Sequence, residues 1–182
     1  MNQSDIKILK CTYVGDTITN NFYSLYYPYQ QELRIIDNGI TEPIETETEC
    51  IVHVDNYQGY TDNVITYNDK EIGIISHQNI DWLDDGQAPL LYIDHLYIKP
   101  EYRHQGIATC AMMDLINKYS KHTIYLYVLK KNKSAKQFWH KLVETANNPK
   151  LIYANDERCM VRDETEALRT CKKIIFKKGN NE

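Results

Sequence analysis

The sequence has no long apolar run: its apolar stretches are only a few residues long, well short of the roughly 20 residues that cross a bilayer. Residues 1–5, Met-Asn-Gln-Ser-Asp, also lack the basic and apolar regions of a signal peptide. The chain has neither an internal repeat nor a low-complexity linker. These absences exclude a membrane-spanning helix, a fibre and a repeat array, and we expect a soluble, cytoplasmic protein.

Paired cysteines are missing as well. The five cysteines are scattered and form no CxxC pair; they are Cys11, Cys50, Cys110, Cys159 and Cys171. An odd number without such pairs indicates neither a disulfide framework nor a zinc site. We therefore expect reduced thiols and no bound metal.

Excess basic charge is also lacking, because 21 Lys and Arg face 25 Asp and Glu, for a net charge of −4. A nucleic-acid-binding domain normally carries a basic field that neutralises phosphates. The charge balance therefore argues against a nucleic-acid partner. Lysines do cluster locally, at Lys130, Lys131, Lys133 and Lys136.

What is present is an ordinary globular composition: 182 residues, 42% of them apolar and 25% charged. This length supports one domain with a full core and is short for two. We expect a single domain over residues 1–182.

Hydrophobic periodicity predicts a mixture of strands and helices. In chain order we expect a strand over 6–14, one or two short helices over 17–36 interrupted by Pro28, a hairpin of 64–67 and 71–77 around a three-residue turn at 68–70, a strand over 90–98, a helix over 106–119, a strand over 123–129, a helix over 134–144, and late strands within 151–162 and 173–177. Residues 41–62 show no clear pattern. The strand over 90–98 is apolar on both faces, which is typical of a central strand, and the order of elements indicates a mixed sheet with helices on both faces.

A strand, a loop and a helix between Tyr92 and Tyr119 carry the clearest chemical signal. Where a loop leads into a helix, unpaired backbone N–H groups and the positive end of the helix dipole favour a phosphate. Gly106 permits close backbone approach, Ala108 is small, and Arg103 adds positive charge. By itself this pattern fits either an anion-binding loop or an ordinary turn between a strand and a helix.

The run from Leu96 to Ala108, LYIKPEYRHQGIA, resembles the central motif of the GNAT acetyltransferase superfamily, in which a strand ending L-x-V/I-x-P leads into R/Q-x-x-G-x-G/A and a long helix. Downstream, the strand around 124–128, followed by Asn132, Ala135 and Phe138, is similar to the family's next strand and its N-x-x-A-x-x-F/L-Y helix. The resemblance spans roughly residues 64–142. It implies an α/β (α+β) fold with a mixed, mostly antiparallel central sheet flanked by helices on both faces.

The resemblance also implies acetyl-CoA as co-substrate and a direct transfer of acetyl to an amine, without a covalent enzyme intermediate. The backbone of the strand end would pair with the pantetheine arm, an N–H near Ile98 would stabilise the oxyanion, the loop would wrap the pyrophosphate and an asparagine would bind the pantetheine region. The implied cofactor-binding residues are Leu96, Tyr97, Ile98, Arg103, His104, Gln105, Gly106, Ile107, Ala108, Thr109 and Asn132. The four clustered lysines would meet the CoA phosphates or be solvated.

The sequence departs from the family at Trp139, where the family commonly has a tyrosine that protonates the leaving thiolate. Indole N–H is far too weak an acid for that step, although a CoA thiolate leaves readily near neutral pH. As catalytic candidates we rank His95 and Asp94 first, expected on opposite faces of the central strand, and then Tyr127. His95 titrates near neutrality, Asp94 could act as base or bind a substrate cation, and Tyr127 could supply the missing acid.

The acceptor amine is left open between a small molecule and a protein. The family builds its acceptor cleft from the first helices and a later loop, which here carry Tyr23, Tyr26, Tyr27, Tyr29 and the segment Asp81–Asp85. Aromatic and acidic walls suit a cationic amine such as a polyamine, an aminoglycoside or a lysine side chain. The alternatives are a catalytically weakened GNAT-fold module that binds CoA or a protein partner, and an unrelated mononucleotide-binding protein. A homodimer is compatible both with the acetyltransferase and with the weakened GNAT-fold module.

Overall fold

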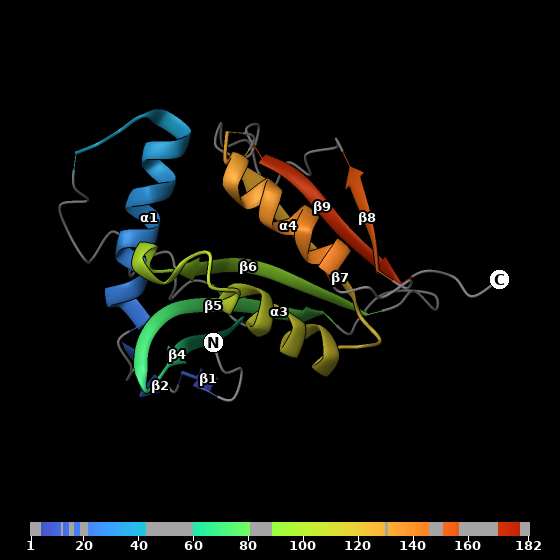
Figure 1. Ribbon diagram of the computed structural model, residues 1–182, viewed down its shortest axis with the longest axis horizontal. Coiled ribbons are helices and arrows are strands. Elements are labelled where there is room, and N and C mark those ends of the chain that lie inside the picture. The colour runs from blue at the N-terminus through green and yellow to red at the C-terminus, as the bar shows by residue number, and fades with distance from the viewer. Residues whose placement is uncertain are drawn as a thin grey trace.

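The computed structural model describes residues 5–11, 13–14, 17–18, 22–42, 60–80, 89–129, 131–145, 151–156 and 171–178 (Figure 1). Their helices and strands are β1 (Ile6–Lys10), β2 (Tyr13–Val14), β3 (Thr17–Ile18), α1 (Phe22–Asn38), β4 (Tyr60–Tyr67), β5 (Lys70–Ile80), β6 (Leu90–Ile98), η2 (Pro100–Tyr102), α3 (Ile107–Lys118), β7 (Thr123–Leu129), α4 (Lys133–Thr145), β8 (Leu151–Asp156) and β9 (Cys171–Lys178). None of the described helices is long and apolar enough to span a membrane.

The N-terminal elements differ most from the sequence-based prediction. The strand expected over 6–14 is two short strands, and residues 17–18 form a strand instead of the start of a helix. The interruption predicted at Pro28 is wrong, because α1 continues through it. A proline inside a helix costs about 3 kcal/mol. Burial of Phe22, Leu25 and Tyr26 on the sheet offsets that cost, since each such side chain contributes roughly 1.5–3 kcal/mol.

The hairpin of β4 and β5 turns through two residues rather than the three expected. Asn68 and Asp69 have φ angles of 50° and 57°, and Tyr67 pairs directly with Lys70. Positive φ at both central residues is what a type I′ turn requires, and Asn and Asp tolerate it better than most residues. The pattern missed four residues at the start of β4, Tyr60 to Asn63, while residues 43–59 lie outside the described part of the chain.

Seven of the described strands form one sheet in the order β1-β4-β5-β6-β7-β9-β8, and β2 pairs with β3. Within the seven, β6 and β7 run parallel and every other neighbouring pair is antiparallel. The predicted mixed, mostly antiparallel sheet is confirmed, as are the strands β6, β7, β8 and β9 and the helices α3 and α4, within a few residues at their ends.

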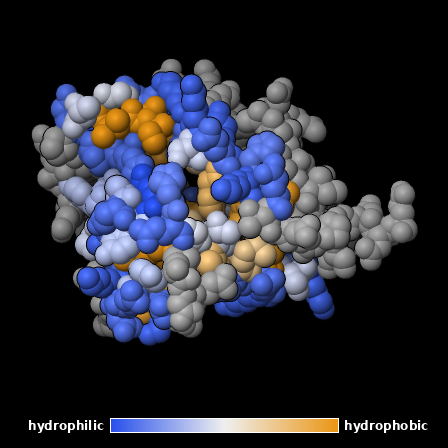
Figure 2. All heavy atoms as spheres, in the orientation of Figure 1, coloured by the Kyte–Doolittle hydropathy of each residue, from blue (hydrophilic) through white to orange (hydrophobic). Residues whose placement is uncertain are grey.

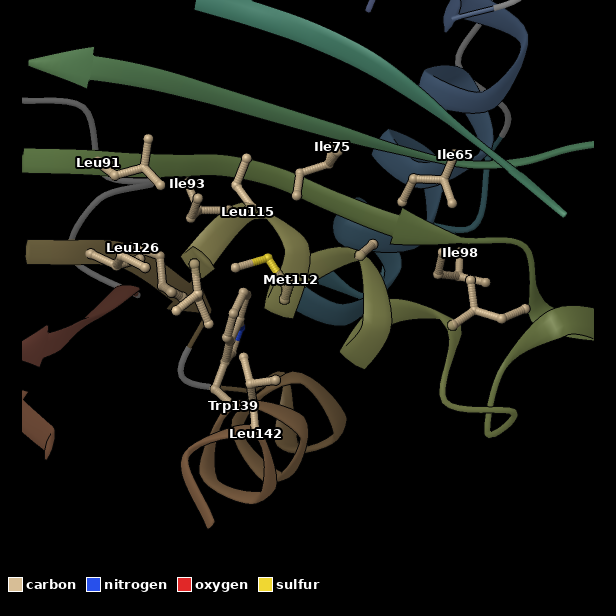
Figure 3. Packing of buried hydrophobic residues seen from close by; sticks show 14 of the residues in the cluster. Ile65, Ile75, Leu91, Ile93, Ile98, Met112, Leu115, Leu126, Trp139 and Leu142 are labelled. Carbon is tan, nitrogen blue, oxygen red and sulfur yellow. The ribbon is translucent and has the colours of Figure 1, made fainter. Parts of the chain in front are cut away.

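Two clusters of buried side chains hold the helices on opposite faces of the sheet. On one face, Met112 and Leu115 of α3 and Trp139 and Leu142 of α4 point at the apolar side chains of the central strands, as Figure 3 shows. On the other face, the α1 cluster joins Phe22, Leu25 and Tyr26 to Val64, Ile74, Tyr97 and Cys11. The expected helices on both faces are therefore confirmed.

The central strand β6 has an extra residue that changes which face its side chains occupy. On β5, Ser76 pairs with His95 and His77 with Ile93, so Asp94 is a bulge residue without a partner on that strand. Before the bulge, Leu91 and Ile93 belong to the core on the α3 side; after it, Leu96 and Ile98 do. Without the bulge, 91, 93 and 95 would share a face.

Candidate active site

A cavity opens where β6 and β7 separate. Their pairing runs from Leu90 with Thr123 to Ile93 with Leu126 and ends at the bulge. Beyond this point lies a cavity of about 560 Å³, bounded by α1, the end of β6, the loop into α3 and the first turns of α4. Figure 2 shows the surface hollowed between α1 and α4.

Ten of the eleven residues predicted to bind the cofactor line this cavity. They are Leu96, Tyr97, Ile98, Arg103, His104, Gly106, Ile107, Ala108, Thr109 and Asn132. Gln105 does not, and its side-chain amide donates instead to the carbonyl of Glu101 at 3.2 Å. The structure thus brings the predicted set to one place, while its role in cofactor binding stays a prediction.

The loop before α3 is shaped by residues in the left-handed region. His104 has φ 61°, and Gly106, the N-cap of α3, has φ 79°. No side chain caps this helix end. The N–H groups of the first turn are therefore left for an anion, which the helix dipole also favours.

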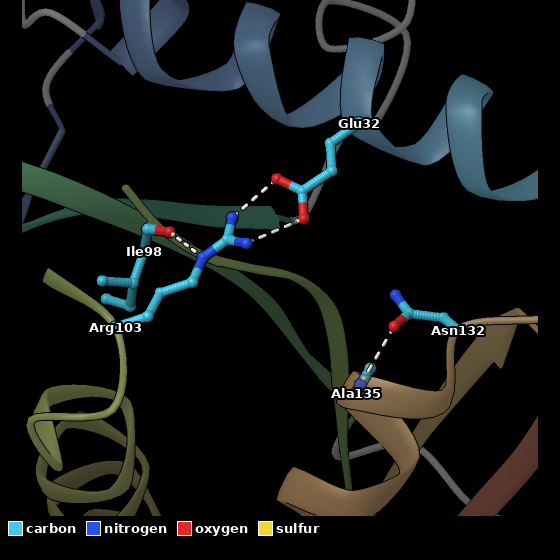
Figure 4. A network of polar contacts seen from close by, with 5 residues as sticks. All are labelled: Glu32, Ile98, Arg103, Asn132 and Ala135. Atoms are coloured by element: carbon cyan, nitrogen blue, oxygen red, sulfur yellow. Dashed lines mark hydrogen bonds and ion pairs between the residues drawn. The ribbon is translucent and has the colours of Figure 1, made fainter. Parts of the chain in front are cut away.

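Arg103, expected from the sequence to add positive charge that favours a pyrophosphate, has a carboxylate partner in the structure. Its guanidinium donates two hydrogen bonds to the carboxylate of Glu32 on α1, at 2.9 and 2.6 Å, and one to the carbonyl of Ile98 at 2.8 Å (Figure 4). It also lies 5.4 Å from the ring centre of Tyr97. The hydrogen bonds to Glu32 raise the pKa of Arg103 above its usual value. Arg103 therefore joins α1 to the loop, and its charge is shared with Glu32.

At the other side of the cavity, Asn132 begins α4. Its Oδ1 accepts a hydrogen bond from the backbone N–H of Ala135 at 3.0 Å, which is an N-cap contact (Figure 4). The neighbouring Lys131 donates to the carbonyl of Asp37 near the end of α1. Together with the Glu32–Arg103 pair, this contact ties α1 to both sides of the cavity. Lys130 lies outside the described residues, and Lys133 and Lys136 lie in the first turn of α4.

The predicted catalytic residues Asp94 and His95 form a pair beside the cavity rather than in its lining. His95 Nε2 is 3.1 Å from Asp94 Oδ2, and both side chains are about one-fifth exposed, at 19% and 21%. The expectation that they lie on opposite faces is wrong, because the bulge at Asp94 places His95 on the side of the sheet that faces α1, where it contacts Asp94. Asp94 Oδ1 also accepts a hydrogen bond from the hydroxyl of Tyr92 at 3.0 Å.

Aromatic rings connect this pair to the cavity and to the third predicted catalytic residue. The ring of His95 contacts Tyr26 at 5.0 Å and Tyr29 at 5.5 Å, and Tyr29 lines the cavity. On the other side, the ring of Tyr92 contacts Tyr127 of β7 at 6.0 Å. Tyr127 is one residue past the end of the β6–β7 pairing, so it too lies at the point of separation.

The sequence of this chain matches the model of the acetyltransferase (GNAT) family over residues 20–143. The chain belongs to the GNAT family. Solved GNAT structures share its fold at low identity. An acetyltransferase of Thermus thermophilus is 10% identical with a TM-score of 0.60, covering 96% of this chain and 98% of its own. A mutant of the spermidine N-acetyltransferase SpeG of Vibrio cholerae is 14% identical with a TM-score of 0.58, covering 94% and 93%.

An aminoglycoside acetyltransferase from an uncultured soil metagenomic sample, in complex with sisomicin, is 14% identical with a TM-score of 0.52, covering 85% of this chain and 98% of its own. No curated protein matches the chain. At these identities the structures establish the fold and leave the acceptor undefined.

Within this GNAT fold, Trp139 is a core residue. Its side chain is only 4% exposed, packs edge-on against Phe138 at 4.9 Å and borders the cavity. In Figure 3 the indole extends from α4 toward Met112 and the sheet. The hydroxyl of Tyr97, which also lines the cavity, is not a ready acid, because burial raises its pKa.

Several site residues were missed in the sequence. Glu32, Leu33 and Ile36 of α1 line the cavity with Tyr29, and their helical spacing on one face was the available signal. Tyr92 gives no signal in the sequence beyond its place in a strand. Of the predicted acceptor walls, Tyr26 is buried, Tyr23 and Tyr27 pack beside the α1 cluster, and the segment 81–85 lies outside the described residues. The described residues contain no group of three or more His, Cys, Asp or Glu that could hold a metal.

Proposed function

We propose that this GNAT protein is an N-acetyltransferase that moves the acetyl group of acetyl-CoA to a primary amine by direct attack. The observation that carries the proposal is the position of the cavity. It lies where β6 and β7 separate, has an uncapped helix N-terminus on one side, and adjoins the Asp94–His95 pair. The helix N-terminus suits a bound polyphosphate, and the Asp94–His95 pair suits a proton transfer.

On the cofactor side, the first turn of α3 would hold the pyrophosphate through its backbone N–H groups. The backbone of Leu96, Tyr97 and Ile98, beyond the last pairing with β7, would bind the pantetheine arm as an added strand. Asn132 lines the opposite wall of the cavity. A cavity of about 560 Å³ is of the size usual for small-molecule sites.

On the acceptor side, His95 is the proposed base. Asp94, which contacts Nε2, would stabilise the imidazolium that forms when the ring takes a proton from the acceptor ammonium. The amine nitrogen then bonds to the thioester carbonyl carbon, and an N–H near Ile98 stabilises the oxyanion. The C–S bond breaks as the carbonyl re-forms, and Tyr127 is the proposed donor of a proton to the thiolate. The proton that the nitrogen loses as the amide forms restores the Tyr127 hydroxyl.

The acceptor we infer is a cationic amine. Asp94 contributes negative charge, and the rings of Tyr92, Tyr127 and Tyr29 provide faces for an alkylammonium group. Small molecules and protein lysines both remain candidates. The single domain over residues 1–182, the cytoplasmic location and the open question of a homodimer stay predictions from the sequence.

The test combines binding with turnover. Calorimetry with acetyl-CoA should give saturable binding, and thiol release should be measured with a panel of polyamines, aminoglycosides and lysine peptides. Thr109→Glu adds a carboxylate to the cavity wall and should weaken acetyl-CoA binding at least about tenfold through repulsion of the phosphates. Asn117→Glu adds the same charge to the exposed far end of α3 and should leave binding unchanged. Equal binding by both variants would contradict the cofactor site.

A second candidate, a weakened GNAT-fold module that binds CoA or a protein partner, is favoured by one observation: Trp139 is a core residue where the family commonly has its acid. Tight acetyl-CoA binding without transfer to any amine in the panel would favour the non-catalytic module. Acetyl transfer above the rate of spontaneous thioester hydrolysis would favour the N-acetyltransferase.

A further inference from the structure

A second carboxylate lies buried in the sheet near the Asp94–His95 pair. Asp62 on β4 is 4% exposed, and Ser76 on β5 is 1% exposed. The hydroxyl of Ser76 donates a hydrogen bond to Asp62 Oδ1. A buried carboxylate is costly unless it is hydrogen-bonded, so the contact with Ser76 stabilises Asp62 in this position.

The sheet register places this carboxylate in line with His95. Asp62 pairs with Ser76, and Ser76 pairs in turn with His95 on β6. Side chains of directly opposed residues lie on the same face, with Cβ atoms about 4.5–5.5 Å apart. Asp62, Ser76 and His95 therefore form a row across three strands.

The row faces α1. Val64 and Ile74, two positions along from Asp62 and Ser76, belong to the α1 cluster. His95 contacts Tyr26, which is itself only 3% exposed. Asp62 thus approaches His95 from the β5 side while Asp94 contacts it directly on β6.

We propose that Asp62, held by Ser76, is a positioning residue that stabilises the imidazolium form of His95 when His95 accepts the proton of the acceptor ammonium. This inference rests on the proposed acetyl transfer. Asp62 touches neither the acceptor nor acetyl-CoA; it acts through its charge. The proton moves from the substrate nitrogen to His95, and Asp62 neither gives nor takes it.

The expected effect follows from distance. Two strand spacings separate Asp62 from His95, roughly 10 Å, and at an effective dielectric constant of about 20 one charge moves a pKa by roughly one unit. Among the described residues, the titratable groups that contact His95 or share its row are Asp94 on β6, Tyr26 and Tyr29 on α1, and Asp62 on β4. The Glu32–Arg103 pair lines the cavity with Tyr29. Cys11, a buried thiol, belongs to the α1 cluster.

Asp62→Asn tests the proposal, because asparagine keeps the shape and the acceptor oxygen but removes the charge. The pKa of His95, followed by NMR and assigned with His95→Gln, should fall by about one unit. The acidic limb of the pH profile of kcat/KM should move to lower pH by the same amount. Asp62→Ser, also neutral, should give the same shift and serves if the asparagine variant does not fold.

Asn63→Ala is the matched control. Asn63 is the next residue of β4, is 5% exposed and donates to two backbone carbonyls, so its loss removes buried hydrogen bonds on the other face. It should lower stability and leave the pKa of His95 unchanged. If Asp62→Asn also leaves that pKa unchanged, the inference is wrong whether or not acetyl transfer occurs. A shifted pKa without transfer to any amine would instead overturn the proposed function.

Discussion

Gly73 of β5 lies where a single methyl group should disturb both the sheet and the cofactor side of the cavity. A Cβ atom at this position would be 2.7 Å from Ile98 Cδ1, 3.3 Å from Ile98 Cα, and closer still to the carbonyl oxygen of Tyr97. Ordinary contact begins at 3.4 Å, so even the side-chain atom must retreat by about 0.7 Å, and the carbonyl cannot move without the strand. Gly73→Ala should therefore push β6 away from β5.

The cost of such overpacking is about 3 kcal/mol, the upper end of the usual range, because the nearest atom belongs to the backbone. For a chain of this length the loss corresponds to a decrease of roughly 6–12 °C in Tm. Acetyl-CoA binding should weaken in parallel, since Tyr97 and Ile98 line the cavity. Calorimetric unfolding and acetyl-CoA titration measure the two effects.

Gly39→Ala is the control for this prediction. Gly39 has φ +69° and no atom within 4 Å of a new Cβ, so alanine at this position would strain the backbone without a steric clash. It should cost about 1–2 kcal/mol and leave acetyl-CoA binding intact. A Tm for Gly73→Ala within about 2 °C of the parent protein would show that β5 and β6 do not approach as closely as the structure has them.

Three further changes have definite expected results. Glu32→Gln should tighten acetyl-CoA binding about threefold, measured by calorimetry, because it removes a negative charge from the cavity wall and frees Arg103; weaker binding would mean that the pair serves to hold the loop. Trp139→Phe should lower Tm by creating a cavity, yet leave kcat within about threefold, because the indole is not the acid. Burial lowers the pKa of His77 to about 4. In the unfolded chain the pKa of His77 is near 6.5, so between pH 4 and 6.5 the unfolded state binds more protons than the folded state. The contribution of His77 to the free energy of unfolding should therefore be full above pH 6.5 and decrease by up to about 3 kcal/mol toward pH 4, as measured by urea titration. His77→Gln should remove that decrease.

The elements around the site could be predicted because their signals are local. The first turn of α3 follows a glycine at a left-handed position, and the apolar face of α4 repeats at helical spacing. Pro28 misled the prediction because its local penalty is offset by burial of Phe22, Leu25 and Tyr26, which depends on a sheet formed later in the chain.

The predicted residues that line the cavity belong to motifs that are each continuous in the chain, one ending in the loop before α3 and one at Asn132. The loop from Arg103 to Thr109 is continuous in the chain. The partner of Arg103, however, is Glu32, 71 residues away, and nothing near either residue indicates the other. The same holds for Asp62 and Ser76, whose pairing follows from the register of a hairpin whose first strand the pattern recognised only in part.

The bulge at Asp94 explains why the candidate base and the cofactor side occur together. The extra residue in β6 turns His95 toward α1, beside Asp94, and returns Leu96 and Ile98 to the opposite face. The parallel pairing with β7 stops at the residue before it. A regular strand would put His95 among the apolar side chains against α3 and would continue to pair with β7, which would close the cavity. The separation of the strands and the orientation of His95 therefore have one structural cause.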